Sequence, residues 1–225
     1  MSIANCGLIM PYYGDISGSL KGLISGDDEL CVAAIVGGDV DDCCRCPKQT
    51  IRNVADIEEA RWYNLLDTQK RRFVDCLRSN RKCLDAGYAK IRERDLQKLS
   101  GSYKIYQPDY IPEWPILFRS DIYFEILNSL TDTNSRDWFY PDRIHSPKQC
   151  ELLEDELNEY LPQFNISTAC SRQKKGIQTA DCLAGSIRET EIGRTDWQPI
   201  IKKGFLSEDR SDWALNKLEY RLSEV

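Results

Sequence analysis

The segment Ile177–Ile187 carries an acidic residue where an apolar one is expected. Apolar side chains recur there at helical spacing, and Asp181 falls on the same stripe. Such a stripe packs inward, and a buried carboxylate without a partner is costly enough to take up a proton instead. The position therefore predicts a partner for Asp181, and a metal ion is one candidate.

Two further aspartates stand at the ends of expected strands. Asp15 follows a short apolar and aromatic run, and Asp142 closes an aromatic run that begins at Asp137. Hard cations such as Mg²⁺ and Mn²⁺ take oxygen ligands, and two such ions about 4 Å apart can clamp the attacking and leaving oxygens of a phosphodiester. If the three elements are neighbours in the fold, Asp15, Asp142 and Asp181 form a catalytic Mg²⁺ or Mn²⁺ site.

Each aspartate also has a simpler structural interpretation. Asp15 precedes Gly18 and suits a turn, and Asp142 suits an Asx-turn or an ion pair with Arg143. Asp181 is the hardest to explain in this way, because acids on apolar helix faces are seldom fully buried without a partner. The sequence leaves these alternatives open.

A basic segment directly precedes the helix that carries Asp181. Its residues Ser171, Lys174 and Lys175 are candidates for holding a substrate phosphate beside the acids, since a helix N-terminus favours anions. The alternative is that these are surface lysines of a solvated loop. Two other basic stretches, Gln69–Lys82 and Lys90–Lys98, suit solvated helix faces.

The cysteines suggest other chemistry only weakly. Cys43 and Cys46 form a C-x-x-C pair, but Cys76 and Cys83 are badly spaced to complete a structural zinc site, so zinc is not favoured. A cysteine nucleophile needs a neighbouring histidine, and the sequence does not place the only histidine, His145, beside a thiol. The ten cysteines are scattered over a chain too large to need staples, so we expect reduced thiols.

Composition limits the class of protein. Of the 225 residues, 41% are hydrophobic and 29% charged, and the net charge is −6, which opposes tight nonspecific binding to nucleic acid. The beginning of the chain lacks the pattern of a signal peptide, and no apolar run is long enough to cross a membrane. We therefore expect a cytoplasmic protein without a membrane partner.

One domain over residues 1–225 is the expected organisation, with residues 191–225 as a C-terminal extension that packs on it. Trp197 and Trp213 in that extension suit packing on the core or on a second subunit, so a homodimer or a protein partner stays open.

The elements that must position the acids combine strands and helices. A run over Glu29–Asp42 is apolar without interruption, which predicts a strand buried on both faces and paired with the strand before Asp15. Ser146 is the expected N-cap of a helix with Pro147 at its first position. The other expected elements are helices over Asp56–Arg78, Ile116–Leu130 and Asp212–Leu222, a strand over Asp137–Ile144, and short strands near residues 82–91 and 163–170. Together they predict an α/β mixed sheet with helices on both faces.

Three stretches also carry a family resemblance. YYGDISGSL, LCVAAIVGG and SRQKKGIQTADCLAGSIR, with YPDRIHSPKQ between them, together resemble the domain-of-unknown-function family numbered thirty-eight hundred. The resemblance spans roughly residues 8 to 190, and its last motif is the most specific. It implies a ribonuclease-H-like fold, in which acids of the first strand, a central strand and a later helix gather around divalent metals.

The family pattern places its acids on Asp15, Asp142 and Asp181, and departs from this chain at Ile16, where the family usually has Glu. Asp39, Asp41 and Asp42 are conceivable substitutes for that Glu. The leading hypothesis is a metal-dependent nuclease that hydrolyses phosphodiesters of a nucleic acid, DNA or RNA. The alternative is an inactive ribonuclease-H-like module that serves an interaction.

Overall fold

A six-stranded mixed sheet forms the centre of the computed structural model, and its strands lie in the order β5-β4-β1-β2-β3-β6. The structure describes residues 10–52, 58–80, 82–103, 113–131, 137–193 and 206–223. The strands are β1 (Pro11–Ser17), β2 (Leu30–Gly38), β3 (Leu84–Arg92), β4 (Trp138–Pro141), β5 (Asn165–Ile166) and β6 (Leu206–Asp209).

The first three strands are antiparallel neighbours, and the others join them in parallel. β1 pairs with β2 so that Asp15 lies opposite Ala34, which confirms the predicted antiparallel pairing, although a helix at Leu20–Ser25 connects the two strands in place of a tight turn. β3 continues the antiparallel series, whereas β4 runs parallel to β1, β5 to β4, and β6 to β3. The short strand expected near residues 82–91 is the nine-residue strand β3, which lies inside the sheet between β2 and β6.

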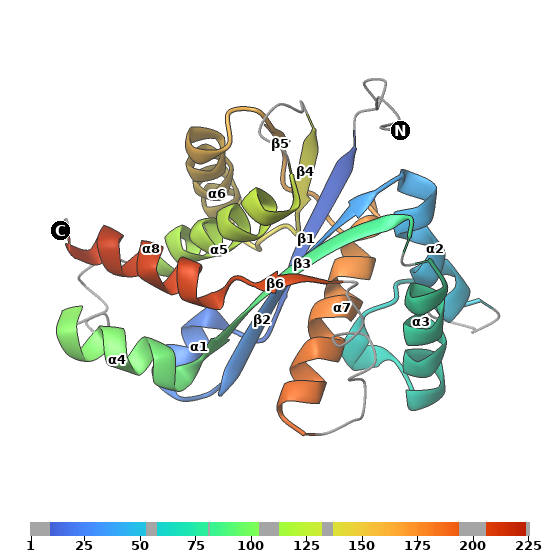
Figure 1. The fold of residues 1–225 in the computed structure, drawn as a ribbon, viewed down its shortest axis with the longest axis horizontal. Coiled ribbons are helices and arrows are strands. Elements are labelled where there is room, and N and C mark those ends of the chain that lie inside the picture. The colour runs from blue at the N-terminus through green and yellow to red at the C-terminus, as the bar shows by residue number, and fades with distance from the viewer. Residues whose placement is uncertain are drawn as a thin grey trace.

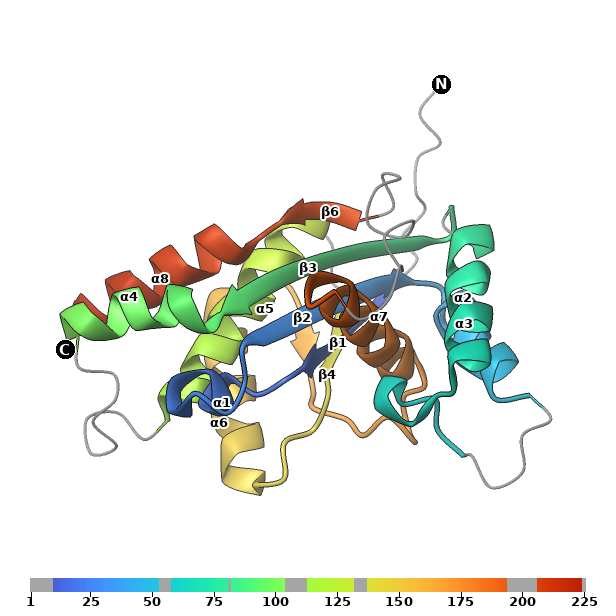
Figure 2. The ribbon, with the colours of Figure 1, turned by 90° about the horizontal axis from the view of Figure 1, so that it is seen from below.

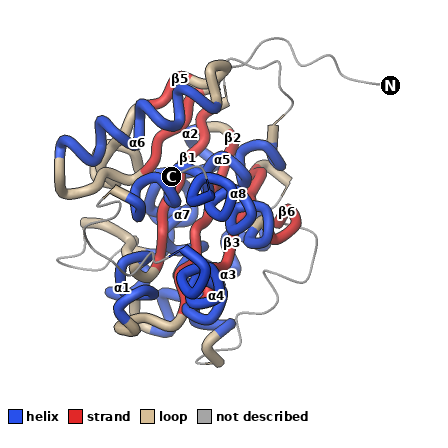
Figure 3. Tube along the Cα trace, turned by 90° about the vertical axis from the view of Figure 1, so that its left-hand side faces the viewer, coloured by secondary structure: helices blue, strands red, loops and turns tan. Residues whose placement is uncertain are grey.

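Helices cover both faces of the sheet, as the apolar run of β2 predicts. Every residue of β2 is buried: Val32 and Val36 point into one core, and Ile35 points into the other. Figures 1 and 2 show α2, α3 and α7 on one side of the sheet and α1, α4, α5, α6 and α8 on the other, and Figure 3 shows β5 and β6 at its two edges. The helices are α1 (Leu20–Ser25), α2 (Val40–Thr50), α3 (Asp67–Asn80), α4 (Glu93–Tyr103), α5 (Trp114–Leu130), α6 (Pro147–Tyr160), α7 (Gly176–Glu191) and α8 (Ser211–Ser223), with a 3₁₀ turn, η1 (Trp62–Asn64).

The predicted helix over Asp56–Arg78 is wrong in its first half. Residues 53–57 lie outside the described ranges, Arg61 is extended, η1 is a single 3₁₀ turn, and α3 begins only at Asp67. Tertiary contacts override the local helical pattern here. The backbone N–H groups of Ala60 and Trp62 donate to side chains of α7 and not to carbonyl groups of a local helix.

The end of the chain contributes to both sheet and core. β6 was not predicted; it pairs with β3 at the sheet edge, and Arg210 N then donates to Tyr88 O. α8 was predicted almost to the residue, and its Ala214, Leu218 and Leu222 join the core on the α5 side. Trp213 is 42% exposed, while Trp197 lies outside the described residues.

Two cysteines depart from the expected reduced state. Cys46 of α2 and Cys76 of α3 form a disulfide, with their Cα atoms 5.5 Å apart, so Cys46 does not act with Cys43 as a metal-binding pair. Seven other described cysteines are free, and most of them are buried. Among the described helices, none has the length and hydropathy needed to cross a bilayer.

Gly185 allows the segment before α3 to pack directly on α7. A Cβ atom at this position would lie 2.4 Å from ring atoms of Trp62, closer than real contacts permit. The missing side chain therefore leaves room for the buried Trp62 side chain beside the helix, and the backbone of Ala60 and Trp62 lies within hydrogen-bonding reach of α7.

We predict that Gly185→Ala lowers the free energy of unfolding by about 1 to 3 kcal/mol through overpacking. An ordinary Gly→Ala change inside a helix stabilises by about 1 kcal/mol, so the sign of the effect separates the two mechanisms in urea unfolding. In a Trp62→Leu background the cost of Gly185→Ala should shrink. Stabilisation of the otherwise wild-type chain would contradict the packing argument.

Candidate functional site

Neighbouring strands hold two of the predicted acids side by side. Gly14 of β1 pairs with Pro141 of β4, and Asp142 N donates to Gly14 O at 2.8 Å, so Asp142 continues β4 beside Asp15. Asp142 also forms a parallel bridge with Ala169 on its other side. Neighbouring strands lie about 4.8 Å apart, so the side chains of Asp15 and Asp142 are attached at adjacent backbone positions.

The third acid comes from α7, which packs on β1 and β2. Asp181 is 8% exposed, and its Oδ2 accepts the N–H of Trp62 at 2.9 Å. Three residues earlier, the Gln178 side chain accepts Ala60 N–H and donates to Ser171 O, both at 3.0 Å. Gln178 and Asp181 of α7 therefore bind the backbone of two other segments, the one at Ala60 and Trp62 and the one at Ser171.

Residues 58–64, which we call the strap, lie across the acids as a result. Glu59 of the strap accepts hydrogen bonds from Ser171 at 2.9 Å and from Arg172 at 2.8 Å, so the loop before α7 is joined to it. Arg61 donates to Ser171 Oγ at 2.7 Å and lies near Glu59 at 3.2 Å. The strap is thus fixed at both its main chain and its charged side chains.

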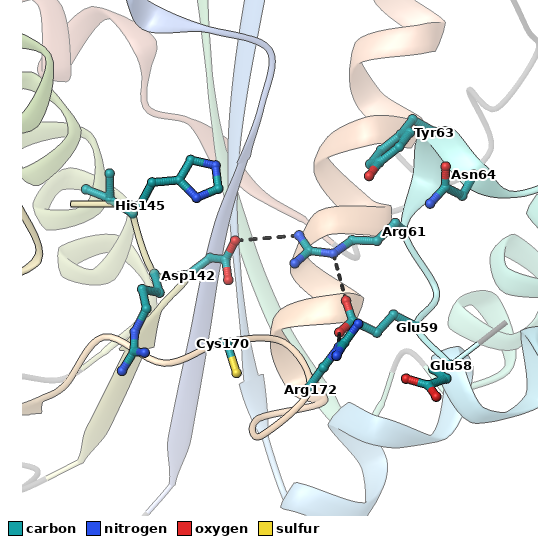
Figure 4. Close-up of a pocket in the computed structure, with 11 residues that line it drawn as sticks. Glu58, Glu59, Arg61, Tyr63, Asn64, Asp142, His145, Cys170 and Arg172 are labelled. Atoms are coloured by element: carbon teal, nitrogen blue, oxygen red, sulfur yellow. Dashed lines mark hydrogen bonds and ion pairs between the residues drawn. The ribbon is translucent and has the colours of Figure 1, made fainter. Parts of the chain in front are cut away.

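Arg61 places a cation between two of the acids. Its Nη1 lies 3.7 Å from Asp15 Oδ2 and 3.5 Å from Asp142 Oδ2. Figure 4 shows the guanidinium reaching from the strap toward Asp142, with Glu59 and Arg172 below it in this view. One positive group therefore neutralises charge that buried carboxylates on adjacent strands cannot disperse into water.

The buried setting shifts the proton affinity of all three acids in the same direction. Burial, then the charges of Asp181 and Asp142, raise the pKa of Asp15 well above its usual range. Burial also raises the pKa of Asp142 against the lowering effect of Arg61, and raises that of Asp181 to about 6, where the Trp62 N–H opposes it. Carboxylates whose pKa values are shifted by burial and by one another's charge cluster at functional sites of proteins.

The donor chemistry of the site fits a hard divalent cation. The groups that face one another are the carboxylates of Asp15, Asp142, Asp181 and Glu59 and the guanidinium groups of Arg61 and Arg119. Acids outnumber bases, and oxygen is the ligand that Mg²⁺ and Mn²⁺ prefer. Within the described ranges, however, no three histidine, cysteine or acidic side chains are arranged to ligate one ion. Binding of a cation between Asp15 and Asp142 thus requires Arg61 to move away.

An open cleft of about 1130 Å³ is lined by Asp142 and Arg61, but not by Asp15 or Asp181. Its lining includes Asp142, Arg143, His145 and Cys170 on one side and the strap, with its 79% exposed Tyr63, on the other. Figure 4 shows this opposition of the two walls. A volume of this size exceeds that of a usual small-molecule pocket, and Asp142 is part of its lining.

The predicted phosphate-binding residues separate in the structure. Ser171 is 1% exposed and bonded to Glu59 and Arg61, so its hydroxyl serves the strap. Lys174 lies 4.1 Å from the centre of the Tyr140 ring, and Lys175 is exposed immediately before α7. Neither lysine lines the cleft beside Asp142, and phosphate binding by Lys174 and Lys175 stays a prediction.

The sequence did not point to the basic groups of the site. Arg61 fell within a predicted helix, Arg119 reaches Asp142 O from α5 at 3.4 Å, and Arg172 reaches Glu59 from the loop before α7. His145, which the sequence left unplaced, lines the cleft three residues after Asp142. Their convergence depends on chain pairing over long distances, for which the sequence contains no local signal.

The structure also locates the residues discussed for the missing family Glu. Ile16 packs against the core on the far side of the sheet from α7, as strand alternation predicts. Asp39 caps α2 by accepting Asp41 N–H at 2.8 Å, near the Tyr12 end of β1. Three residues of strand separate Tyr12 from Asp15, roughly 10 Å, so the described structure does not bring these acids to the site.

Comparisons with known proteins bear on the fold. No protein-family model matches the chain, and neither does any curated protein. A chain in the solved structure of the PCNA:RNase HII complex from Archaeoglobus fulgidus matches with a TM-score of 0.54 and 16% identity, over 86% of this chain and 77% of that chain. The likeness confirms a ribonuclease-H-like α/β fold, with strands in the order 3-2-1-4-5 and β6 added beyond β3.

We predict that Asp181 makes the stability of the metal-free protein fall as the pH rises. Its pKa is raised from 3.8 to about 6 on folding, so the folded protein binds this proton more tightly than the unfolded chain does. The resulting stabilisation is complete below about pH 3.8 and is lost as the pH rises through about 6. Asp181→Asn should remove up to about 3 kcal/mol of this dependence. Urea unfolding in EDTA between about pH 4 and 7 tests it; equal pH dependence in both proteins would rule it out.

We also predict that Arg61→Met strengthens Mn²⁺ binding, because it removes the cation that lies between Asp15 and Asp142. Isothermal titration calorimetry should show a dissociation constant lower by about tenfold or more. Arg45→Met is the matched control, since Arg45 pairs with Asp42 outside the site. Unchanged or weaker binding by Arg61→Met would refute the competition between guanidinium and metal.

Proposed function

We propose that this protein is a metal-dependent phosphodiesterase, a nuclease that uses Asp15, Asp142 and Asp181 to bind Mg²⁺ or Mn²⁺. The observation that supports the proposal is that Asp15 and Asp142, on adjacent strands, share the guanidinium of Arg61, whose strap is held by Asp181, and that Asp142 lines an open cleft in a ribonuclease-H-like fold. A divalent cation bound there would supply a Lewis acid and an activated water for attack on phosphorus.

The residues of the chain take distinct roles in this proposal. Asp15 and Asp142 offer oxygen ligands from adjacent strands, and Asp181 adds a third carboxylate while it holds the strap. Arg61, once released from the acids, remains on the strap and can neutralise charge on a phosphate. Lys174 and Lys175 provide further positive charge near the cleft, whereas Ser171 acts only through Glu59 and Arg61.

Two more assignments belong to the same proposal. The resemblance to the domain-of-unknown-function family numbered thirty-eight hundred rests on the sequence motifs alone, because no family model matches the chain. The buried roles of Gln178 and Asp181 supply a reason for their spacing in the last motif. A single domain over residues 1–225, with residues 191–225 packed on it, is supported by the pairing of β6 with β3.

A catalytically inactive interaction module is the second candidate. Two observations favour it: Arg61 already neutralises Asp15 and Asp142, and Ile16 stands where the family has an acid. A protein of this kind retains the fold and uses the internal guanidinium in place of a metal. Its acids would then have a structural role.

Cleavage of labelled DNA, RNA and DNA–RNA hybrids, single- and double-stranded, with Mg²⁺ or Mn²⁺ separates the two candidates. We expect metal-dependent cleavage by the wild type, and a loss of about 100-fold or more in Asp15→Asn and Asp181→Asn. Asp75→Asn is the control, because this residue is on α3, is 73% exposed and is not part of the site. Inert wild-type protein that also binds no Mn²⁺ in calorimetry would favour the inactive module.

A further inference from the structure

A second, basic pocket adjoins the acidic cleft. It has a volume of about 330 Å³, and Arg172 lines both spaces. Half of its eight lining residues are cationic and none is acidic; the cations are Lys48, Arg172, Lys174 and Lys175. In a protein with a net charge of −6, such a local excess of positive charge has to be explained.

A row of aromatic rings leads away from this pocket along the sheet. Tyr13 lines the pocket and stacks with Tyr140, with 5.7 Å between ring centres and 23° between planes. Tyr140 in turn stacks with Trp138 at 5.7 Å and 7°. Lys174 lies over the Tyr140 ring, so positive charge accompanies the row.

The row ends at solvent. Trp138 is 37% exposed, although it lies on the same face of the sheet that α7 covers at β1 and β2. Within the row, Trp138 is the ring that is exposed, because Tyr13 is buried and the Tyr140 ring contacts Tyr13, Trp138 and Lys174. An exposed aromatic side chain beside cations is a feature of surfaces that stack unpaired bases while they hold the adjoining phosphates.

The row is also in line with the candidate site. Trp138, Tyr140 and Asp142 are alternate residues of one strand and its continuation, so Trp138 lies roughly 13 Å from Asp142. At 3.4 Å per stacked nucleotide this is the length of about four nucleotides. A strand with one phosphate at the acids can therefore extend along the row.

We infer that the face formed by Trp138, Tyr140, Lys48, Lys174 and Lys175 binds a single-stranded segment of nucleic acid and directs it to the acidic cleft. The delivery of the strand to the acids rests on the proposed nuclease function. In a duplex the faces of the bases are covered by the neighbouring base pairs and cannot stack on aromatic side chains, so a duplex gains only the phosphate contacts of this surface. Single-stranded segments are accordingly the preferred ligand.

Fluorescence anisotropy with labelled oligonucleotides of about ten nucleotides tests this in EDTA, where metal-dependent cleavage is absent. We expect tighter binding of single-stranded than of duplex oligonucleotides. Trp138→Ala should weaken single-strand binding by about tenfold. Lys48→Gln with Lys175→Gln should reduce the slope of log K against log salt by about 1.4, since each phosphate contact contributes about 0.7.

Trp213→Ala and Lys21→Gln are matched controls, because both residues are exposed on other helices, α8 and α1. Equal affinity for duplex and single strands, with no effect of Trp138→Ala, would overturn the inference even if the protein cleaves nucleic acid. Selective binding that depends on Trp138, in a protein without nuclease activity, would support the inference while the nuclease proposal fails.

Discussion

Asp181 is a buried carboxylate on α7, and its need for a hydrogen bond or an opposite charge determines how the strap is arranged. A buried charge requires hydrogen bonds or an opposite charge. The strap provides both, through the Trp62 N–H and the nearby Arg61 guanidinium. Because Gly185 allows close approach and Gln178 holds Ala60, the strap has little choice of position. Arg61 is thereby placed at Asp15 and Asp142.

The same arrangement gives the acids two possible partners. In the absence of a divalent cation, Arg61 offsets the mutual repulsion of Asp15 and Asp142, which would otherwise weaken the sheet at its centre. A divalent cation carries more charge and binds more oxygens, but it must also compensate for the lost guanidinium contacts. The balance between these partners decides whether the fold works as an enzyme or as a scaffold.

The sequence predicted those elements whose signal lies within a short segment. The unbroken apolar run predicted β2 and helices on both sides, Pro147 marked the start of α6, and the polar interruption at Asp181 marked the site. The sequence did not predict features that depend on contacts between segments far apart in the chain. The apolar spacing around Trp62 resembled a helix, yet α7 takes up its backbone hydrogen bonds, and the disulfide between Cys46 and Cys76 joins positions that no spacing rule connects.

The strap is anchored to α7 through main-chain N–H groups, which every residue type except proline provides. Glu58, Tyr63 and Asn64 line the cleft from this strap and are exposed. Substitutions at these three positions are therefore separated from the anchoring of the strap. This wall of the cleft can diversify during evolution, and exchange one ligand preference for another, while the acids beneath it keep their places.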